Sequence, residues 1–410
     1  MTTPVPSDRG RWRFTLHQRV YTPTPWQQTI VAVLTDVRSR RLEQGWNAAA
    51  QLSFSIDGRS SQAALIQELA TEVIAWRWDE QIGADRPMFR GVIDHGEDTL
   101  SEQAYTINFV AHDLLGIIGR RYLTGTVTYT QTDQDLIVAN LLSLAVNAHA
   151  GDGTSFLPGS WLAVSASITN PDGTIRGQYS GQLRDRTYTG STAIGQSVDD
   201  LAKVIGGFDY DIRPLFSDTV DALRVFYPTQ GVTRSDIVLM YGATVSALTR
   251  TVASTDYANY QRVLGNNGNS DPSVPQLAAE AWDNNATPGV VGSVGLWQAT
   301  DSAADVTDQA TLAQKAHGDL NLSGLLVPSY SLTMRPGAYS YGNPNLGDTV
   351  PLIVLAGRLN VNTTIRVLGI TYAISDDGAE DVTLTVGRPL STLADLFTRA
   401  DRDVDALTRR

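Results

Sequence analysis

The chain of 410 residues contains no cysteine and only two lysines, Lys203 and Lys315. Without cysteine, disulfide bonds, thiolate metal sites and cysteine nucleophiles are excluded. Neither lysine follows a glycine and precedes a serine or threonine, so the sequence lacks the usual phosphate-binding loop. A Ser-x-x-Lys acyl-transfer motif is also absent, as are Gly-x-Ser-x-Gly, Gly-x-Gly-x-x-Gly and His-Glu-x-x-His.

Long apolar runs and a positive charge balance are missing as well. No segment approaches the roughly 18 consecutive apolar residues of a membrane span, and residues 1–13 lack the apolar run of a secretory signal. The 31 basic residues stand against 43 acidic ones, and the net charge of −12 disfavours a protein that mainly grips nucleic acid. Scarce lysine and glutamate favour strands over helices. The sequence therefore predicts a soluble, β-rich protein.

Alternating apolar residues predict an N-terminal β-barrel module over residues 1–125. One face of residues 50–57 carries Leu52, Phe54 and Ile56. A short helix is expected behind Ser60 and Ser61, and Gly96-Glu97-Asp98 predicts a turn. The predicted strands are residues 12–21, 50–57, 71–78, 88–94 and 104–110.

The middle of the chain predicts an α/β insertion domain over residues 126–250. Residues 133–150 have helical apolar spacing behind the caps Thr132 and Asp133, and residues 197–205 predict a second helix that ends at Gly206-Gly207. The sequence Asn170-Pro171-Asp172-Gly173 predicts the turn of a hairpin. The predicted strands are residues 161–169, 174–183, 208–213 and 222–227.

Three further segments complete the predicted organisation. Residues 251–325 form a connector with a loop at 266–295 and a helix at 307–320, and residues 326–390 form a second β-barrel module whose last turn is Asp376-Asp377-Gly378. Residues 391–410 predict an amphipathic helix, whose apolar face either covers its own subunit or is a partner interface. The candidate interface residues are Leu393, Leu396, Phe397, Val404 and Leu407.

A weak internal repeat connects the two β-modules. Residues 90–93 (RGVI) lead through a polar turn to an alternating strand, and residues 368–371 (LGIT) do the same. We therefore expect a mixed, β-dominated α+β fold: two related small β-barrel modules separated by an α/β insertion, plus the C-terminal amphipathic helix.

The residues suited to chemistry form no recognisable catalytic, cofactor-binding or metal-binding motif. His95 and His112 could approach each other beside Asp94 and Asp113, but zinc needs three or four ligands. The paired carboxylates stand mostly in predicted turns or at a helix start, where they serve the backbone. Two alternatives stay open: a cell-wall hydrolase that uses carboxylate pairs, and a carbohydrate-binding module that uses Trp76 and Trp78.

Four segments carry a resemblance to a known family. They are residues 89–92 (FRGV) with the hairpin that follows, 206–212 (GGFDYDI), 258–265 (ANYQRVLG), and 346–350 (LGDTV) with the strand 365–370 (IRVLGI). In this order, the chain resembles the tail-tip or baseplate hub proteins, often called minor tail proteins, of tailed bacteriophages. The likeness covers about residues 50–390, and its motifs are short and largely structural.

The resemblance implies a structural virion protein of the phage tail tip, made in the host cytoplasm, without enzymatic activity or cofactor. It implies a homotrimer in which three pairs of related β-barrels match the six-fold tail tube. The expected partners are the tail tube or distal tail protein ring, a tip or fibre protein, and genomic DNA that passes through the lumen without specific binding. An acidic protein suits such a lumen, because like charges repel.

Overall fold

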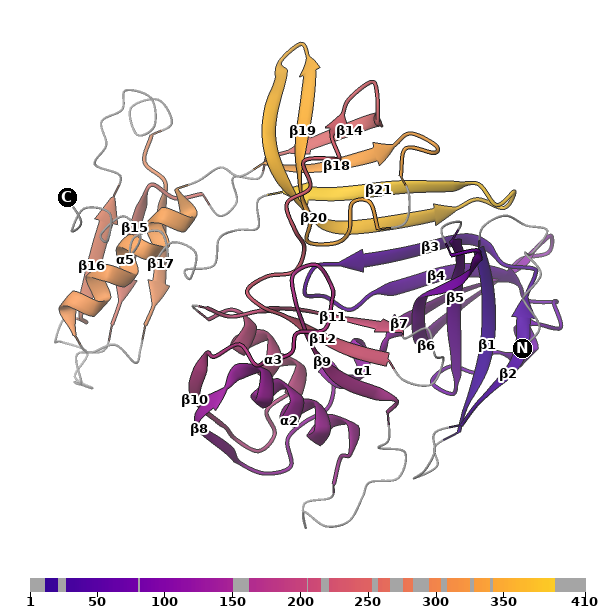
Figure 1. Cartoon of the computed structure of the whole chain (residues 1–410), viewed down its shortest axis with the longest axis horizontal. Coiled ribbons are helices and arrows are strands. Elements are labelled where there is room, and N and C mark those ends of the chain that lie inside the picture. The colour runs from indigo at the N-terminus through magenta and orange to yellow at the C-terminus, as the bar shows by residue number, and fades with distance from the viewer. Residues whose placement is uncertain are drawn as a thin grey trace. The chain divides into compact units, whose positions relative to one another are not determined.

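The computed structural model describes most residues between Trp12 and Gly387 and divides the chain into two units (Figure 1). Unit 1 comprises Met1–Leu248 and Ser331–Val386, and unit 2 comprises Thr249–Tyr330 and Gly387–Arg410. The described residues are 12–20, 27–79, 82–149, 162–204, 206–214, 221–252, 257–265, 276–282, 295–303, 308–324, 328–339 and 342–387. The predicted helix at 391–410 lies outside them.

A sheet of thirteen strands forms the frame of unit 1. Its main path runs β14-β18-β21-β20-β3-β4-β7-β6-β5-β1-β2, with β19 beside β20 and β13 beside β19. The first strands are β1 (Trp12–Val20), β2 (Gln27–Leu34), β3 (Arg38–Gly45), β4 (Gln51–Asp57), β5 (Thr71–Asp79), β6 (Ala84–Leu100) and β7 (Tyr105–Asp113). The later strands are β13 (Leu239–Met240), β14 (Val245–Thr251), β18 (Ser329–Met334), β19 (Thr349–Ala356), β20 (Leu359–Ile374) and β21 (Glu380–Gly387).

The same strand order occurs twice in this sheet. Strands β4 to β7 lie in the order β5-β6-β7-β4, and strands β18 to β21 lie in the order β19-β20-β21-β18. If the strands of each set are numbered one to four along the chain, both sets have the spatial order 2-3-4-1. The two sets therefore have equivalent connections. The weak sequence repeat falls on the equivalent strands β6 and β20.

The two sets form one continuous sheet, not the two closed barrels that the sequence predicts. No closed barrel occurs among the described strands, because β3 pairs with β4 on one side and with β20 on the other. Strand β3 was not predicted, since its residues 38–45 (RSRRLEQG) are mostly polar and show no apolar alternation. Only Arg40 and Leu42 of this strand are buried. The β-rich α+β class is nevertheless confirmed.

The insertion between the two sets has its own apolar core of helices and short strands. Its elements are α1 (Leu114–Gly119), β8 (Val127–Asp133), α2 (Gln134–Val146), β9 (Val164–Thr169), β10 (Leu183–Tyr188), α3 (Ile194–Ala202), β11 (Asp209–Pro214) and β12 (Asp221–Phe226). As predicted, Asp133 caps α2, because its carboxylate accepts a hydrogen bond from the N–H of Asp135 at 2.9 Å. Ile137, Leu141 and Ala145 then point into the core.

Three local predictions are wrong. Gly96-Glu97-Asp98 is no turn, because β6 continues to Leu100 and pairs with β7 up to the turn at Ser101. Residues 174–182 form no strand: only Ile175 makes an isolated antiparallel bridge, to Thr169 across the predicted turn, and β9 pairs along its length with β12. The helix expected behind Ser60 is a single 3₁₀ turn, Ala63–Leu65. In each case tertiary pairing overrides local propensity.

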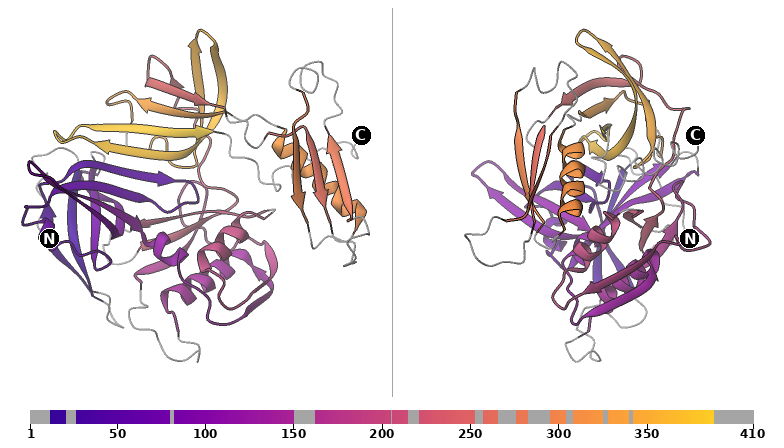
Figure 2. Two further views of the ribbon diagram at one scale, coloured as in Figure 1. Left: turned by 180° about the vertical axis from the view of Figure 1, so that it is seen from behind. Right: turned by 90° about the vertical axis from the view of Figure 1, so that its left-hand side faces the viewer.

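Unit 2 is a three-stranded sheet with one helix across it (Figure 2). The strand order is β16-β15-β17, and β16 lies within residues 266–295, which the sequence predicts as a loop. Its elements are β15 (Tyr260–Leu264), β16 (Ala278–Trp282), β17 (Gln298–Ser302) and α5 (Gln309–Ser323). The predicted helix at 307–320 is thus confirmed, and Leu312, Ala316 and Leu320 pack against the sheet.

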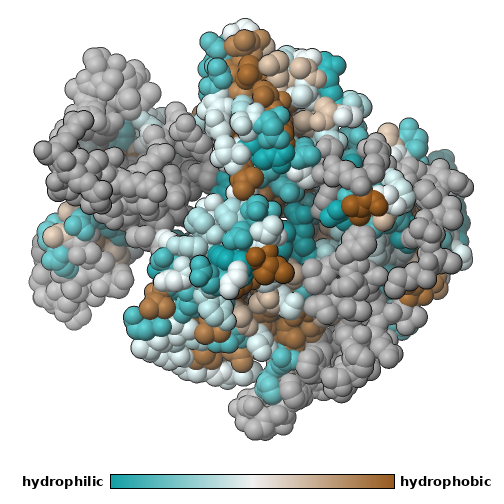
Figure 3. Space-filling model, in the orientation of Figure 1, coloured by the Kyte–Doolittle hydropathy of each residue, from teal (hydrophilic) through white to brown (hydrophobic). Residues whose placement is uncertain are grey.

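The surface of unit 1 is mixed, with small apolar patches among polar residues (Figure 3). One patch lies over the hairpin of β19 and β20 at the top of that view. Its neighbourhood exposes Leu355 at 73%, Met240 and Tyr241. Strand β2, at the other end of the sheet, exposes Ile30 and Val31. None of the described helices is both long and apolar enough to span a membrane.

The glycines of the two repeated strands differ in how closely their neighbours approach. A Cβ on Gly91 would lie 2.4 Å from the backbone oxygen of His112, whereas one on Gly369 would meet nothing closer than 3.4 Å. We expect Gly91→Ala to lower the free energy of unfolding by about 2 kcal/mol through overpacking, as measured by urea denaturation. Gly369→Ala is the matched control, and an equal loss in both variants would contradict this explanation.

Candidate functional site

The front motif FRGV places an arginine at the contact between β6 and the insertion. The Arg90 side chain is 1% exposed, and its Nη1 donates to Oδ1 of Asp221 at 2.9 Å. Asp221 is fully buried at the start of β12. The next residue is Gly91, where a side chain would collide with the backbone oxygen of His112 on β7. This motif therefore attaches the first strand set to the insertion.

The surroundings of Arg90 contain more acid than base. Glu72 and Asp113 are buried nearby, and burial raises the pKa of Asp113 to about 7. Burial also raises the pKa of Asp221 to about 7, although Arg90 opposes this shift, and the charge of Glu72 adds to it. Burial and the Arg90 charge lower the pKa of His17 to about 4. The contact is thus a buried polar cluster around one guanidinium.

A second arginine connects the other strand set to the insertion. Arg366 of β20 donates through Nη2 to Oδ2 of Asp209 at 2.6 Å and to the carbonyl of Gln230 at 2.7 Å. Its Nε donates to the carbonyl of Gly347 at 3.0 Å, and its guanidinium lies 5.0 Å from the ring centroid of Trp46. Three of the quoted motifs, IRVLGI, GGFDYDI and LGDTV, therefore meet at this side chain.

A third arginine connects the two strand sets directly. Arg77 of β5 forms a two-pronged pair with Glu380 of β21, with Nε–Oε2 and Nη2–Oε1 distances of 2.8 and 2.9 Å. The side chains are 5% and 10% exposed. Trp12 also donates its indole N–H to Glu380 at 2.5 Å. Burial opposes the charge of Arg77, but the bonds to Glu380 leave its pKa raised.

Together the three pairs define the candidate functional site, which we call the arginine junction: Arg90–Asp221, Arg366–Asp209 and Arg77–Glu380. Each pair joins a different two of the three parts of unit 1. Guanidinium is planar, always charged and able to bond two oxygens at once, so arginine suits buried contacts where lysine does not. The motifs quoted from the sequence contain Arg90, Asp209 and Arg366, whereas Asp221, Arg77 and Glu380 lie outside them and were not predicted to pair.

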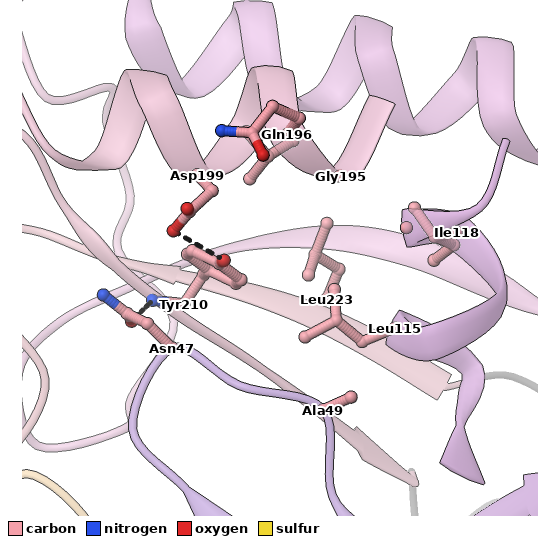
Figure 4. Close-up of a pocket in the computed structure, with 11 residues that line it drawn as sticks. Asn47, Ala49, Leu115, Ile118, Gly195, Gln196, Asp199, Tyr210 and Leu223 are labelled. Atoms are coloured by element: carbon pink, nitrogen blue, oxygen red, sulfur yellow. Dashed lines mark hydrogen bonds between the residues drawn. The ribbon is translucent and has the colours of Figure 1, made fainter. Parts of the chain in front are cut away.

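A cavity of about 300 Å³ is lined by residues of the insertion and by Asn47, which donates to Asp209 at 3.3 Å (Figure 4). Apolar side chains of α1, α3 and β12 form most of its wall, and Asn47 enters from the β3–β4 loop. Asp199 and Tyr210 are its only titratable lining residues, and the Tyr210 hydroxyl donates to Asp199 at 3.4 Å. Asp199 also pairs with Lys203 at 2.5 Å. These bonds hold the wall together and form no catalytic constellation.

His112 Nδ1 lies 2.9 Å from Asp94, and Asp113 caps α1. His95 is exposed and lies opposite Val110 in the strand register, whereas His112 lies opposite Val92. No group of three metal-ligating side chains occurs in the described part of the chain. Asp79 pairs with Arg86 at 2.9 Å, and Glu380 belongs to the arginine junction.

The two tryptophans considered for glycan binding are part of the packing of unit 1. Trp76 donates to the hydroxyl of Thr15 at 2.9 Å, and the Arg13 guanidinium lies 5.0 Å from its ring centroid. Trp78 is half-buried on the same strand. The candidate interface residues Leu393, Leu396, Phe397, Val404 and Leu407 lie outside the described residues.

Comparison with solved structures shows which class of protein has this fold. The 43 kDa tail protein of prophage MuSo2 from Shewanella oneidensis is similar over 93% of this chain and 99% of its own, with a TM-score of 0.58 and 11% identity. A tail protein from Neisseria meningitidis MC58 is similar over 94% and 99%, with a TM-score of 0.54 and 10% identity.

The chain therefore shares its fold with phage tail proteins, and the resemblance that the sequence suggested is confirmed at the level of the fold. No family model and no curated protein sequence matches the chain. The likeness extends over almost the full length of the chain, so it includes both strand sets and the insertion.

The pKa values around Arg90 predict how the stability of the protein changes with pH. Asp221 and Asp113 each have a pKa near 7 in the folded protein and 3.8 in the unfolded chain. The folded state therefore binds more protons between these values, and the unfolding free energy falls as the pH rises from 3.8 to about 7. The lowered pKa of His17 has the opposite effect: it makes the unfolding free energy rise as the pH rises from about 4 to 6.5. Asp221→Asn lacks this titrating carboxyl group. Between pH 5 and pH 7, we therefore expect the unfolding free energy of wild type to fall by about 2 kcal/mol more than that of the variant.

The measurement is urea denaturation of wild type and Asp221→Asn at several pH values. Asp376→Asn, in an exposed turn, is the matched control and should keep the wild-type pH profile. Parallel profiles of wild type and Asp221→Asn would show that Asp221 does not titrate in this range.

Proposed function

We propose that this chain is a structural protein of the phage virion, a trimeric hub at the distal end of the tail. In this role it links the six-fold tail tube to tip or fibre proteins and forms part of the DNA conduit. The observation that carries the proposal is the strand order found twice in one chain, together with the fold shared with phage tail proteins.

Symmetry explains why a repeated unit would be useful in such a hub. Three copies of a chain with two equivalent β-modules would present six similar modules around one axis. A ring of this kind can contact a six-fold tube through nearly equivalent surfaces. The proposed modules are residues 1–125 and 326–390, separated by the insertion at 126–250 and the connector at 251–325.

Two exposed apolar regions support a closed ring of copies. Strand β2 is one end of the described sheet path and exposes Ile30 at 62% and Val31 at 38%, while Leu355 and Met240 are exposed on the β13–β19 side. A cyclic assembly joins two different surfaces of neighbouring copies. Strand β2 lies beyond β1, next to the first strand set, and β13 lies beside β19 of the second set, so each copy would have one surface for each neighbour.

Equivalent hairpins carry exposed carboxylates in both strand sets. Glu97 and Asp98 lie near the tip of the β6–β7 hairpin, and Asp376 and Asp377 form the tip between β20 and β21. We propose that these hairpins line the conduit, where negative charge repels the phosphates of passing DNA and prevents it from binding.

Native mass spectrometry of the full chain tests the assembly. We expect a particle of about 133 kDa, three times the chain mass of 44.3 kDa. Val31→Lys or Leu355→Lys should each convert the trimer into monomer, because a buried unpaired charge is costly at an interface. Leu100→Lys is the matched control, since Leu100 is 72% exposed at a hairpin tip outside both regions.

A monomer for wild type at all concentrations, or a trimer in both interface variants, would contradict this assembly. Electron microscopy of the wild-type particle provides a second measurement. A ring with six similar lobes is the expected image.

The C-terminal segment is proposed to bind a tip or fibre protein through Leu393, Leu396, Phe397, Val404 and Leu407. If this apolar stripe serves a partner, deletion of residues 391–410 should leave the melting temperature of the chain unchanged. A clear fall in melting temperature would instead show that the stripe packs on its own subunit. Circular dichroism at matched protein concentration distinguishes the two outcomes.

A further inference from the structure

Among the described residues of unit 2, one face of the sheet is covered by a helix and the other face is open. Helix α5 covers the face that carries Val263, Ala279 and Ala281, and these residues form a core with Leu312 and Ala316. Because side chains alternate along a strand, the residues between them point to the other face. The burial of β15 and β16 follows this alternation.

The strand register arranges the open face in rows. Tyr260 of β15 lies between Trp282 of β16 and Gln298 of β17. In the next row, Arg262 lies between Glu280 and Thr300. An aromatic row thus stands directly beside a row of hydrogen-bonding groups.

The aromatic row presents a large exposed surface. Trp282 is 51% exposed, and its ring centroid lies 6.5 Å from that of Tyr260, with ring planes only 13° apart. A second aromatic pair follows along the chain, where Trp297, 48% exposed, packs edge-on against Tyr257. Exposed aromatic clusters of this kind are typical of binding surfaces.

The polar row is ordered by its own contacts. Arg262 Nε lies 3.7 Å from Oε1 of Glu280, and partial desolvation and a hydrogen bond to Glu280 raise the pKa of Tyr260. Hydrogen-bond donors and acceptors therefore stand in the row beside the rings. Gln298 and Thr300, both exposed, add an amide and a hydroxyl on the third strand.

Charge disfavours a nucleic acid on this face. Residues 249–330 contain three basic residues, Arg250, Arg262 and Lys315, against eight acidic ones, which gives a net charge of −5. Lys315 pairs with Asp301 and Asp319, so it belongs to the side of α5. Binding of phosphates needs clustered cations, and residues 249–330 contain no such cluster.

We propose that the open face of the unit 2 sheet binds a neutral glycan of β-linked, gluco-configured pyranose units. Such sugars have equatorial substituents, so each ring has a flat C–H face that can stack on Trp282 and Tyr260. Their hydroxyl groups at the ring edge meet Glu280, Arg262, Gln298 and Thr300. This function is independent of the proposed tail assembly, and it assigns glycan binding to Trp282 in place of Trp76 and Trp78.

The test uses the full chain with two probes, chitotetraose and cellotetraose, and isothermal titration calorimetry as the measurement. We expect at least one probe to bind wild type, and Trp282→Ala to lower its association constant about tenfold or more. Tyr122→Ala is the matched control, because Tyr122 is a 62% exposed aromatic residue of unit 1. It should bind like wild type.

Circular dichroism checks that each variant is folded, and Gln298→Ala provides a second variant that removes only a hydrogen-bonding side chain. Failure of both probes to bind at millimolar concentration would overturn the proposal. Binding that is unchanged in Trp282→Ala and Gln298→Ala would also overturn it. A single-stranded oligo(dT) that binds through Trp282, without sugar binding, would identify a nucleic-acid surface instead.

Discussion

The arrangement of unit 1 depends on the burial of arginine charges between its parts. A buried guanidinium is costly to desolvate, and a partner carboxylate compensates for this cost only if the geometry is good and the remaining donors are bonded. Arg77 meets that condition with a two-pronged pair, and Arg366 meets it with one carboxylate and two carbonyls. Such contacts tolerate few alternative arrangements. We infer that the arginine junction specifies how the parts of unit 1 pack, while apolar burial supplies most of the stability.

This constraint also explains what could be read from the sequence. Strands with apolar alternation, such as β4 with Leu52 and Phe54, were predicted because the pattern is local. The pairs of the junction were not, because 131, 157 and 303 residues separate their members along the chain. Strand β3 was missed for a related reason: its buried Arg40 reads as a surface residue until its carbonyl partner, Ser375, is known. Polar residues in cores are hard to recognise without their partners.

The repeat is preserved in connections more than in residues. Both strand sets have the same neighbour relations, yet the glycines of the equivalent strands β6 and β20 have different surroundings. Gly91 is needed where β6 passes the backbone at His112, whereas Gly369 has ordinary contacts. Only the strand order has to persist if the modules are to occupy equivalent places in a ring. Local sequence can then diverge, because each set meets different neighbours: β6 the insertion through Arg90, and β20 both the insertion and β3.

Unit 2 can carry a separate function because its core is its own. The residues that pack beneath α5 all belong to β15, β16, the loops beside them or α5 itself. None of the three pairs of the arginine junction involves this unit, so substitutions on its open face leave the junction intact. The tryptophans show the same division: Trp12 is 2% exposed and bonded to Glu380, whereas Trp282 is half exposed on a sheet face. The buried aromatic residues of unit 1, such as Trp12, serve packing. In unit 2, Trp282 and Trp297 are about half exposed, and the polar residues in the row beside Trp282 are consistent with recognition of a ligand.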